Sequence, residues 1–137
     1  MTIAEKQQAL VEEFEFFEEW MDKYDHIIGM GKSLDTLADA EKEDDLLVQG
    51  CQSKVWLKAE KQGENVVFKA DADAIIAKGI IAMLIDVFSN QPAKEVAMAE
   101  LTFLEQIGLK DHLSPTRANG LMSMIKQMKF YALALAG

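Results

Sequence analysis

Residues 46–57 read Leu46-Leu47-Val48-Gln49-Gly50-Cys51-Gln52-Ser53-Lys54-Val55-Trp56-Leu57. Both ends of this segment have the composition of strands, because Val, Leu and Trp suit a pleated, half-buried surface. Gly50 lies between them and permits backbone angles that residues with a Cβ resist, which predicts a bend. Cys51, the only cysteine of the chain, is therefore expected at a bend between two strands.

The residue types around Cys51 leave two interpretations open. Free cysteine is among the most buried residue types and often serves as a small hydrophobe in a core. Here, however, Gln52 and Ser53 are polar neighbours and Lys54 is a nearby cation. Such surroundings favour the thiolate form, so the segment predicts either a core cysteine or a nucleophile.

The residues that follow predict a β-hairpin. Residues 54–60 alternate between apolar and charged side chains, with Trp56 as the exception on the polar face. Residues 62–65 supply a turn with a glycine, and residues 66–68 return as an antiparallel strand. We expect residues 46–48 to add a third strand, which makes a small antiparallel sheet.

Helices account for most of the remaining chain. Thr2 and Glu5 fit a capping box at the start of a first helix, and Ser114 with Pro115 opens the last one. Apolar residues recur at helical spacing in the first of these helices. They are Leu10, Phe14, Phe17 and Met21.

Glycines shape the expectations for two further helices. A short helix over residues 24–30 should end at residues 29–31, where two glycines offer left-handed caps. Another helix, capped by Asp71 or Asp73, is apolar almost all round to residue 88 and is therefore buried. Gly79 in its middle is expected to permit a close approach to the sheet. The predicted class is α+β, with helices packed against one small three-stranded antiparallel sheet.

Size and composition limit the classes of function. The 137 residues suit one domain over residues 1–137. The net charge of −9 argues against nonspecific nucleic-acid binding, which depends on Lys and Arg. No apolar run reaches the roughly 20 residues that span a bilayer, and the first residues lack the plan of a secretory signal. Together with the single cysteine, these features predict a cytoplasmic protein that binds no membrane.

The single cysteine also limits redox and metal chemistry. It excludes an internal disulfide, and it excludes an iron–sulfur cluster held by the chain's own thiolates, because such sites need several cysteines. We therefore expect no iron–sulfur cluster held by this chain alone.

An acidic stretch precedes the cysteine segment, opposed only by Lys42. It predicts either a solvated loop or a patch complementary to a partner. Its members are Asp35, Asp39, Glu41, Glu43, Asp44 and Asp45.

Four segments of the chain resemble, in order and spacing, the SufE family of sulfur-acceptor proteins. They are residues 24–34, 50–57, 71–79 and 109–121. The second of them, Gly-Cys-Gln-Ser-Lys-Val-Trp-Leu, is similar to the active-cysteine motif of that family. The resemblance covers nearly the whole chain.

The resemblance implies a fold related to the IscU-like scaffold proteins of cluster assembly. It also implies that Cys51 takes persulfide sulfur from a SufS-like cysteine desulfurase, stimulates that enzyme, and passes the sulfur to a SufBCD-like iron–sulfur scaffold. The chain would be an accessory protein rather than an enzyme in the strict sense. It would bind neither a metal nor a cofactor, and pyridoxal phosphate would belong to the desulfurase.

The resemblance also names residues around the cysteine. Loop and docking candidates are Gly50, Gln52, Ser53, Lys32, His112 and Arg117. Arg117 lies in the first turn of the last helix, where the helix dipole gives a cation no benefit. We therefore expect it to face the cysteine loop or the partner, whereas Lys32 by itself indicates only an exposed lysine.

Two other classes compete with the sulfur acceptor. A cysteine hydrolase would need His26 or His112 as the base for Cys51, and neither lies in a local signature. An adaptor with an incidental cysteine would bind through the acidic stretch or a helix face. A transferable sulfur, an acyl adduct or no adduct on Cys51 would distinguish the three classes.

Overall fold

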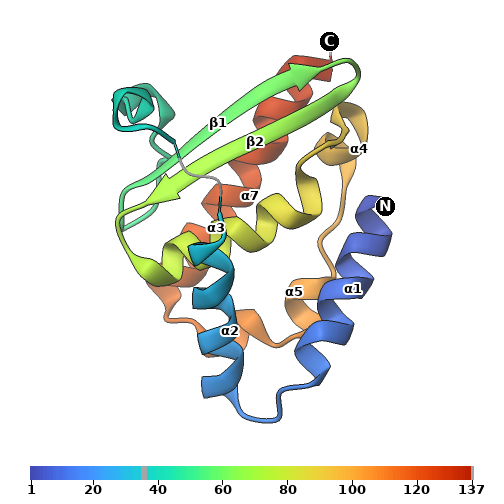
Figure 1. Cartoon of the computed structure of the whole chain (residues 1–137), viewed down its shortest axis with the longest axis vertical. Helices are drawn as coiled ribbons and strands as arrows, with labels where there is room; N and C mark the ends of the chain where they lie inside the picture. Colours follow the sequence, from blue (N-terminus) through green and yellow to red (C-terminus); the bar gives the residue numbers. More distant parts are fainter. Residues whose placement is uncertain (35–36, 137) are drawn as a thin grey trace.

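The computed structural model describes residues 1–34 and 37–136 (Figure 1). Asp35 of the acidic stretch lies outside the described residues. The α-helices of the described part are α1 (Ile3–Glu15), α2 (Trp20–Lys32), α3 (Ile75–Phe88), α4 (Ala93–Met98), α5 (Phe103–Gln106), α6 (Leu109–His112) and α7 (Pro115–Ala136). Its strands are β1 (Val55–Gln62), β2 (Asn65–Ala72) and β3 (Gln91–Pro92), and two 3₁₀ turns, η1 (Asp39–Glu41) and η2 (Asp44–Leu46), precede β1.

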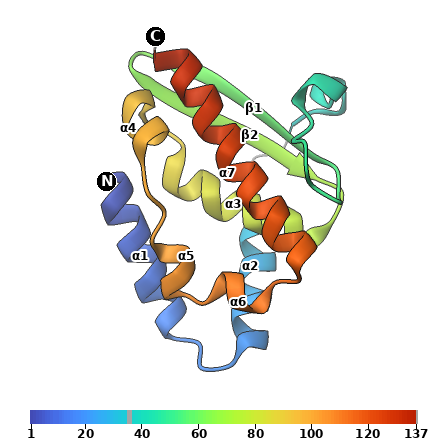
Figure 2. The same ribbon diagram turned by 180° about the vertical axis from the view of Figure 1, so that it is seen from behind.

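The fold is α+β, as predicted. Strands β1 and β2 form a long antiparallel hairpin, and α3 and α7 pack against one of its faces (Figures 1 and 2). Helices α1 and α2 lie beyond α3, so α3 is enclosed between them and the sheet. The end of the hairpin that leads out of the cysteine segment therefore lies close to both α3 and α7.

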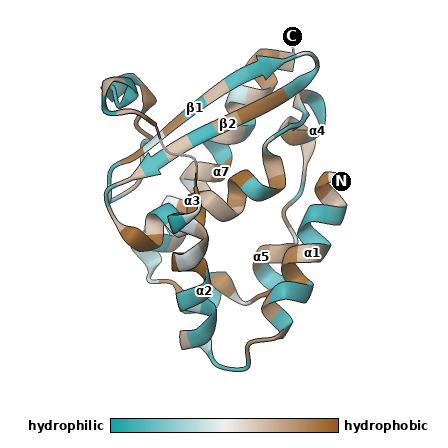
Figure 3. Cartoon of the chain, viewed as in Figure 1, coloured by the Kyte–Doolittle hydropathy of each residue, from teal (hydrophilic) through white to brown (hydrophobic). Residues whose placement is uncertain are grey.

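Helix α3 is the centre of the core. Most of it is coloured as hydrophobic in Figure 3, and ten of its residues are buried. An almost wholly apolar helix avoids contact between its side chains and water by lying between other elements, as the sequence predicted. The start of the helix differs from the prediction. Its N-cap is Ala74, and neither Asp71 nor Asp73 caps it.

The sheet has three strands, but the third is not the predicted one. Residues 46–48 make one isolated bridge, from Leu47 to Trp56, because Leu46 ends the 3₁₀ turn η2. The third strand is β3, whose two residues pair with Asn65 and Val66 at the far end of β2. The prediction for residues 46–48 was therefore wrong.

Two glycines let α2 and α3 approach closely. A Cβ on Gly79 would lie 2.3 Å from the carbonyl oxygen of Ile27, and one on Gly31 would lie 2.8 Å from the nitrogen of Gly79. Helix α2 runs through Gly29 and Gly31 to Lys32, so the predicted helix end at residues 29–31 was wrong. Gly79 serves the contact with α2 rather than the predicted approach to the sheet.

The ends of the chain follow their local signals. The capping box of Thr2 and Glu5 is present, and Ser114 Oγ accepts a hydrogen bond from the N–H of Arg117 at the start of α7. The apolar stripe of the first helix is confirmed at Leu10 and Phe14, which are buried. The prediction for Met21 was wrong, since this residue belongs to α2 and is 64% exposed.

Candidate functional site

Cys51 lies on a short loop that is closed at its base by hydrogen bonds. The N–H of Val48 donates to the carbonyl of Val55 over 2.8 Å. Lys54 precedes Val55 in the chain, and its N–H donates to Oδ1 of Asp73 over 3.0 Å. The base of the loop is thus attached to the first strand and to the residue that follows β2. Within the loop, Gly50 has a φ of 92°, which confirms the predicted bend and explains the glycine.

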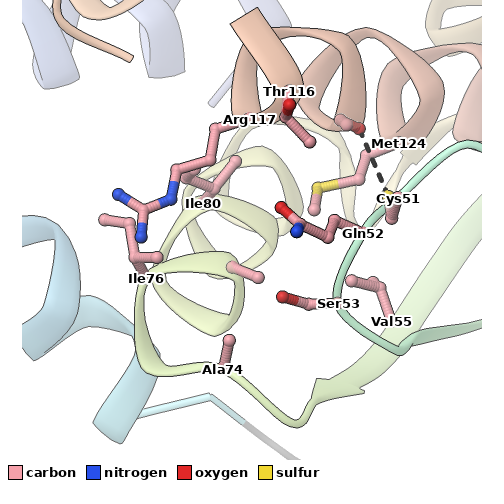
Figure 4. Close-up of a pocket in the computed structure, with 12 residues that line it drawn as sticks. Cys51, Gln52, Ser53, Val55, Ala74, Ile76, Ile80, Thr116, Arg117 and Met124 are labelled. Atoms are coloured by element: carbon pink, nitrogen blue, oxygen red, sulfur yellow. Dashed lines mark hydrogen bonds between the residues drawn. The ribbon is translucent and has the colours of Figure 1, made fainter. Parts of the chain in front are cut away.

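The tip of the loop rests on two small residues of α7. Gly120 lies against the sulfur, since a Cβ there would be in van der Waals contact with the Cys51 Sγ at 3.5 Å. Ser123, one turn further along, faces Gly50, on which a Cβ would come within 2.5 Å of the serine hydroxyl. The Cys51 S–H donates to the carbonyl oxygen of Gly120 over 3.5 Å, the dashed line in Figure 4. The resting loop is therefore seated on α7.

A small cavity of about 100 Å³ lies beside Cys51 (Figure 4). Side chains from β1, α3 and α7 make its wall mostly apolar, whereas its polar members come from the loop and the first turn of α7. The apolar members are Val55, Ala74, Ile76, Ala77, Ile80 and Met124, and the polar ones are Gln52, Ser53, Thr116 and Arg117.

Arg117 belongs to the same cavity as Cys51. Its side chain extends past Ile76 (Figure 4), and its Nη1 donates to the hydroxyl of Tyr24 in α2 over 3.5 Å. The side chain is otherwise exposed to solvent. The rim of the cavity therefore carries a positive charge.

The resting state of Cys51 is the thiol. The side chain is half-buried, and this burial raises the pKa of the Cys51 thiol above its usual value. The prediction that the neighbouring residues favour the thiolate was wrong for this conformation. Lys54 is exposed and does not line the cavity, so its charge does not offset the loss of water around the sulfur.

The other candidate residues lie apart from the cavity. Lys32 is exposed at the end of α2. His112 stacks on Trp20 with 4.3 Å between ring centroids, and its Nδ1 lies 2.8 Å from the carbonyl oxygen of Gly108. His26 bonds with Glu13 over 2.8 Å. Neither histidine lines the cavity of Cys51, which counts against a cysteine hydrolase.

Apart from Arg117, the contributions of α3 and α7 to the site were not predicted. Gly120 and Ser123 stand three residues apart, so they share one helix face and form the seat of the loop. That spacing of small residues is a weak signal that sequence reasoning could have used. Ile76, Ala77 and Ile80 gave no such signal, because they read as ordinary core residues.

The acidic stretch is partly neutralised by ion pairs. Glu41 accepts from Lys58 over 2.8 Å, and Asp39 pairs with Lys42 over 3.4 Å. Within the described ranges, no helix is both long enough and apolar enough to cross a membrane. The same ranges contain no group of three or more His, Cys, Asp or Glu side chains placed to hold a metal ion.

Comparisons with known proteins agree with this picture. Residues 8–132 match the family model of the SufE Fe-S metabolism associated domain. An uncharacterised SufE-like protein of Rhizobium meliloti (strain 1021) is 36% identical over 125 residues, which cover 88% of this chain and 89% of that protein. SufE-like protein 1 of Arabidopsis thaliana, named as chloroplastic and mitochondrial, is 37% identical over 131 residues, 95% of this chain and 35% of that longer protein.

A solved structure shares the fold at low sequence identity. It is the solution structure of a hypothetical protein from Thermus thermophilus, with a TM-score of 0.78, 15% identity and coverage of 95% of both chains. That similarity supports the fold alone. The family model and the two relatives cover most of the chain at a level that unrelated proteins do not reach, and the chain therefore belongs to the SufE family.

Proposed function

We propose that this protein accepts sulfur on Cys51 from the persulfide of a cysteine desulfurase and passes it to an iron–sulfur cluster assembly scaffold. The observation that carries the proposal is the placement of the only cysteine, on a loop fastened at its base and seated beside a small apolar cavity. Membership of the SufE family supports it. The pyridoxal phosphate of the reaction belongs to the desulfurase.

The transfer is a thiol exchange that conserves electrons. The Cys51 thiolate attacks the outer sulfur of the desulfurase persulfide, so a bond forms to that sulfur and the bond between the two desulfurase sulfurs breaks. The desulfurase cysteine leaves as a thiolate and takes up the proton that Cys51 gave up. The enzyme's thiol is then free for another turnover, which explains why the acceptor should stimulate it.

The seated loop is expected to open for this reaction. The Cys51 sulfur is half-buried and donates to the Gly120 carbonyl, and both restraints limit its approach to a cysteine on another protein. After transfer, the loop can return with one additional sulfur atom. The cavity of about 100 Å³ exceeds the roughly 30 Å³ that a water molecule occupies in the liquid, and a sulfur atom is of similar size. Its mostly apolar wall would shelter the persulfide from other thiols.

The raised pKa of Cys51 predicts slow reaction with alkylating agents at neutral pH. Because the thiol form dominates below the pKa, the rate of alkylation of the free protein by iodoacetamide should keep rising above the usual cysteine pKa of about 8.5. Rates from pH 6 to 10, followed by mass spectrometry, measure this. The same protein unfolded in urea is the control and should show an unshifted midpoint. A midpoint below that of the unfolded protein would indicate a preformed thiolate.

Arg117→Ala should slow sulfur transfer about tenfold and leave folding nearly unchanged. The guanidinium at the cavity rim can pair with the anionic sulfur or with an acidic group of the partner, and a hydrogen bond to a charged group contributes about 1.5–3 kcal/mol. An exposed side chain usually changes stability by less than about 0.5 kcal/mol. Single-turnover transfer and thermal unfolding test this, with Arg117→Lys as the charge-preserving control. A large fall in melting temperature with normal transfer would make the residue structural.

The direct test of the function is chemical. The protein is incubated with a cysteine desulfurase and cysteine, and the peptide that contains Cys51 is examined by mass spectrometry. We expect an added mass of one sulfur atom that is lost on reduction and that a scaffold protein can remove. We place this chemistry in a reducing compartment such as the cytoplasm, because the thiol must stay free.

A further inference from the structure

A buried carboxylate lies outside the Cys51 cavity. Asp71 is 7% exposed and stands near the end of β2, directly opposite Trp56 of β1. A buried charge is costly unless it is paired and hydrogen-bonded. Asp71 meets that condition through Lys42 at 2.7 Å, Lys78 at 3.3 Å and the N–H of Ala72 at 2.8 Å. The sulfur transfer described above does not use this group.

The two lysines come from different elements. Lys42 lies between η1 and η2, in the segment that leads into the cysteine loop, and Lys78 belongs to α3. Ala77, the neighbour of Lys78, lines the cavity of Cys51. The Asp71 carboxylate therefore joins the approach to the loop, the end of the hairpin and α3 at one point.

Lys42 is the best-placed polar link between this segment and the sheet. Its Nζ contacts a carboxylate whose side chain is only 10% exposed, and it also lies 5.5 Å from the centroid of the Trp56 ring. The parallel link from Glu41 to Lys58 joins side chains that are 37% and 34% exposed. Water and salt screen such an exposed pair more strongly than a buried one.

Asp71 and Lys42 are both charged at neutral pH, as an ion pair between them requires. Burial raises the pKa of this carboxyl, but the hydrogen bonds from Lys42, the Ala72 N–H and Lys78 together outweigh it, so the pKa lies below its usual value. The hydrogen bond to Asp71 likewise raises the pKa of Lys42. Both groups therefore stay charged at neutral pH.

We propose that the Lys42–Asp71 ion pair is a positioning device for Cys51, which holds residues 38–47 against the sheet and thereby keeps the cysteine loop seated on α7. Residues 38–47 end one residue before Val48, whose N–H closes the base of the loop. Release of residues 38–47 from the sheet would therefore remove one of the constraints on the base of the cysteine loop. The inference rests on the proposed function, in which the loop is expected to open to receive sulfur. Lys42 and Asp71 act through the loop and do not touch the reacting sulfur.

The arrangement around Asp71 provides its own matched control. Lys42→Met and Lys78→Met each remove one lysine from the same carboxylate, but only the first releases the segment before the loop. Helix α3 remains held by its buried apolar residues when Lys78 is changed. Asp86→Asn changes a residue of α3 and removes its exposed ion pair with Lys6 of α1. This variant is a second control away from Cys51.

The experiment measures alkylation of Cys51 by iodoacetamide in the isolated native protein at one fixed pH. Lys42→Met should raise the rate roughly fivefold, since a change of one or two kcal/mol shifts an opening equilibrium by a factor of about 5 to 30. Lys42→Arg keeps the cation and should restore the rate. Lys78→Met and Asp86→Asn should stay within about twofold of the native protein, and thermal unfolding of each variant reports its stability.

Two results would overturn the inference. An unchanged alkylation rate in Lys42→Met would show that the pair does not control the loop. An equal rise in Lys42→Met and Lys78→Met would show that the carboxylate only stabilises the fold. No desulfurase is present in this experiment, so neither result bears on sulfur transfer. Failure of the proposed sulfur transfer would appear separately, as a Cys51 peptide without added sulfur after incubation with the enzyme.

Discussion

Cys51→Ser should abolish both sulfur loading of this protein and its stimulation of a cysteine desulfurase. Serine preserves the shape of the loop and can donate to the Gly120 carbonyl as the thiol does. A hydroxyl, however, cannot form a persulfide, and the chain has no second cysteine that could replace it. The loss should therefore be complete rather than partial.

The measurement pairs desulfurase turnover with mass spectrometry of the acceptor. Circular dichroism and the melting temperature of the variant should match those of the native protein, because the substitution changes one half-buried atom. Native protein alkylated at Cys51 is the control for steric effects and should also fail to stimulate. Stimulation that survives in the serine variant would reject the acceptor role and favour an adaptor that acts by binding alone.

Gly79→Ala should produce the largest loss of stability among single small substitutions in α3. The added Cβ would lie 2.3 Å from the carbonyl oxygen of Ile27, which belongs to the backbone of α2 and cannot move aside as a flexible side chain can. Helices α2 and α3 would have to separate, and overpacking of this kind costs about 1–3 kcal/mol, or more where the backbone resists. We expect a value near the upper end of that range.

Gly29→Ala is the matched control for this prediction. Gly29 also lies inside a helix, but a Cβ there meets no atom within 4 Å. Alanine is favoured over glycine in a helix interior by about 0.8–1 kcal/mol, so this variant should be slightly more stable than the native protein. Denaturant unfolding of both variants makes the comparison. Equal stabilities would contradict the close approach of α2 to α3.

The effect of Gly79→Ala should extend to the site. Ile76, Ala77 and Ile80 of α3 line the cavity beside Cys51, within one turn of Gly79. A displaced α3 would change the wall against which the loop is seated. Alkylation of Cys51 at a temperature where the variant remains folded should therefore be faster than in the native protein.

Much of the site could be predicted because its signals are local. The positive φ of Gly50 agrees with the bend that this glycine predicted, although no strand precedes it, and the capped start of α7 follows from Ser114 and Pro115. The placement of Arg117 beside the cysteine loop was also expected, and it lines the cavity of Cys51. By contrast, Lys32 and His112, which the resemblance gave as loop and docking candidates, do not line the cavity, and their part in docking stays a prediction.

Sequence alone determined the α+β class, the β1–β2 hairpin, the buried α3 and the presence of the single cysteine at a bend. These features depend on alternation, capping and hydrophobicity over a few neighbouring residues, and such local patterns can be recognised in the sequence itself. Only the tertiary structure decided that β3 is the third strand, that Gly79 faces α2, and that Cys51 rests as a thiol on Gly120. The physical reason is that these features arise from contacts between distant segments, where burial and close packing override local preference and alter the charge state of a side chain.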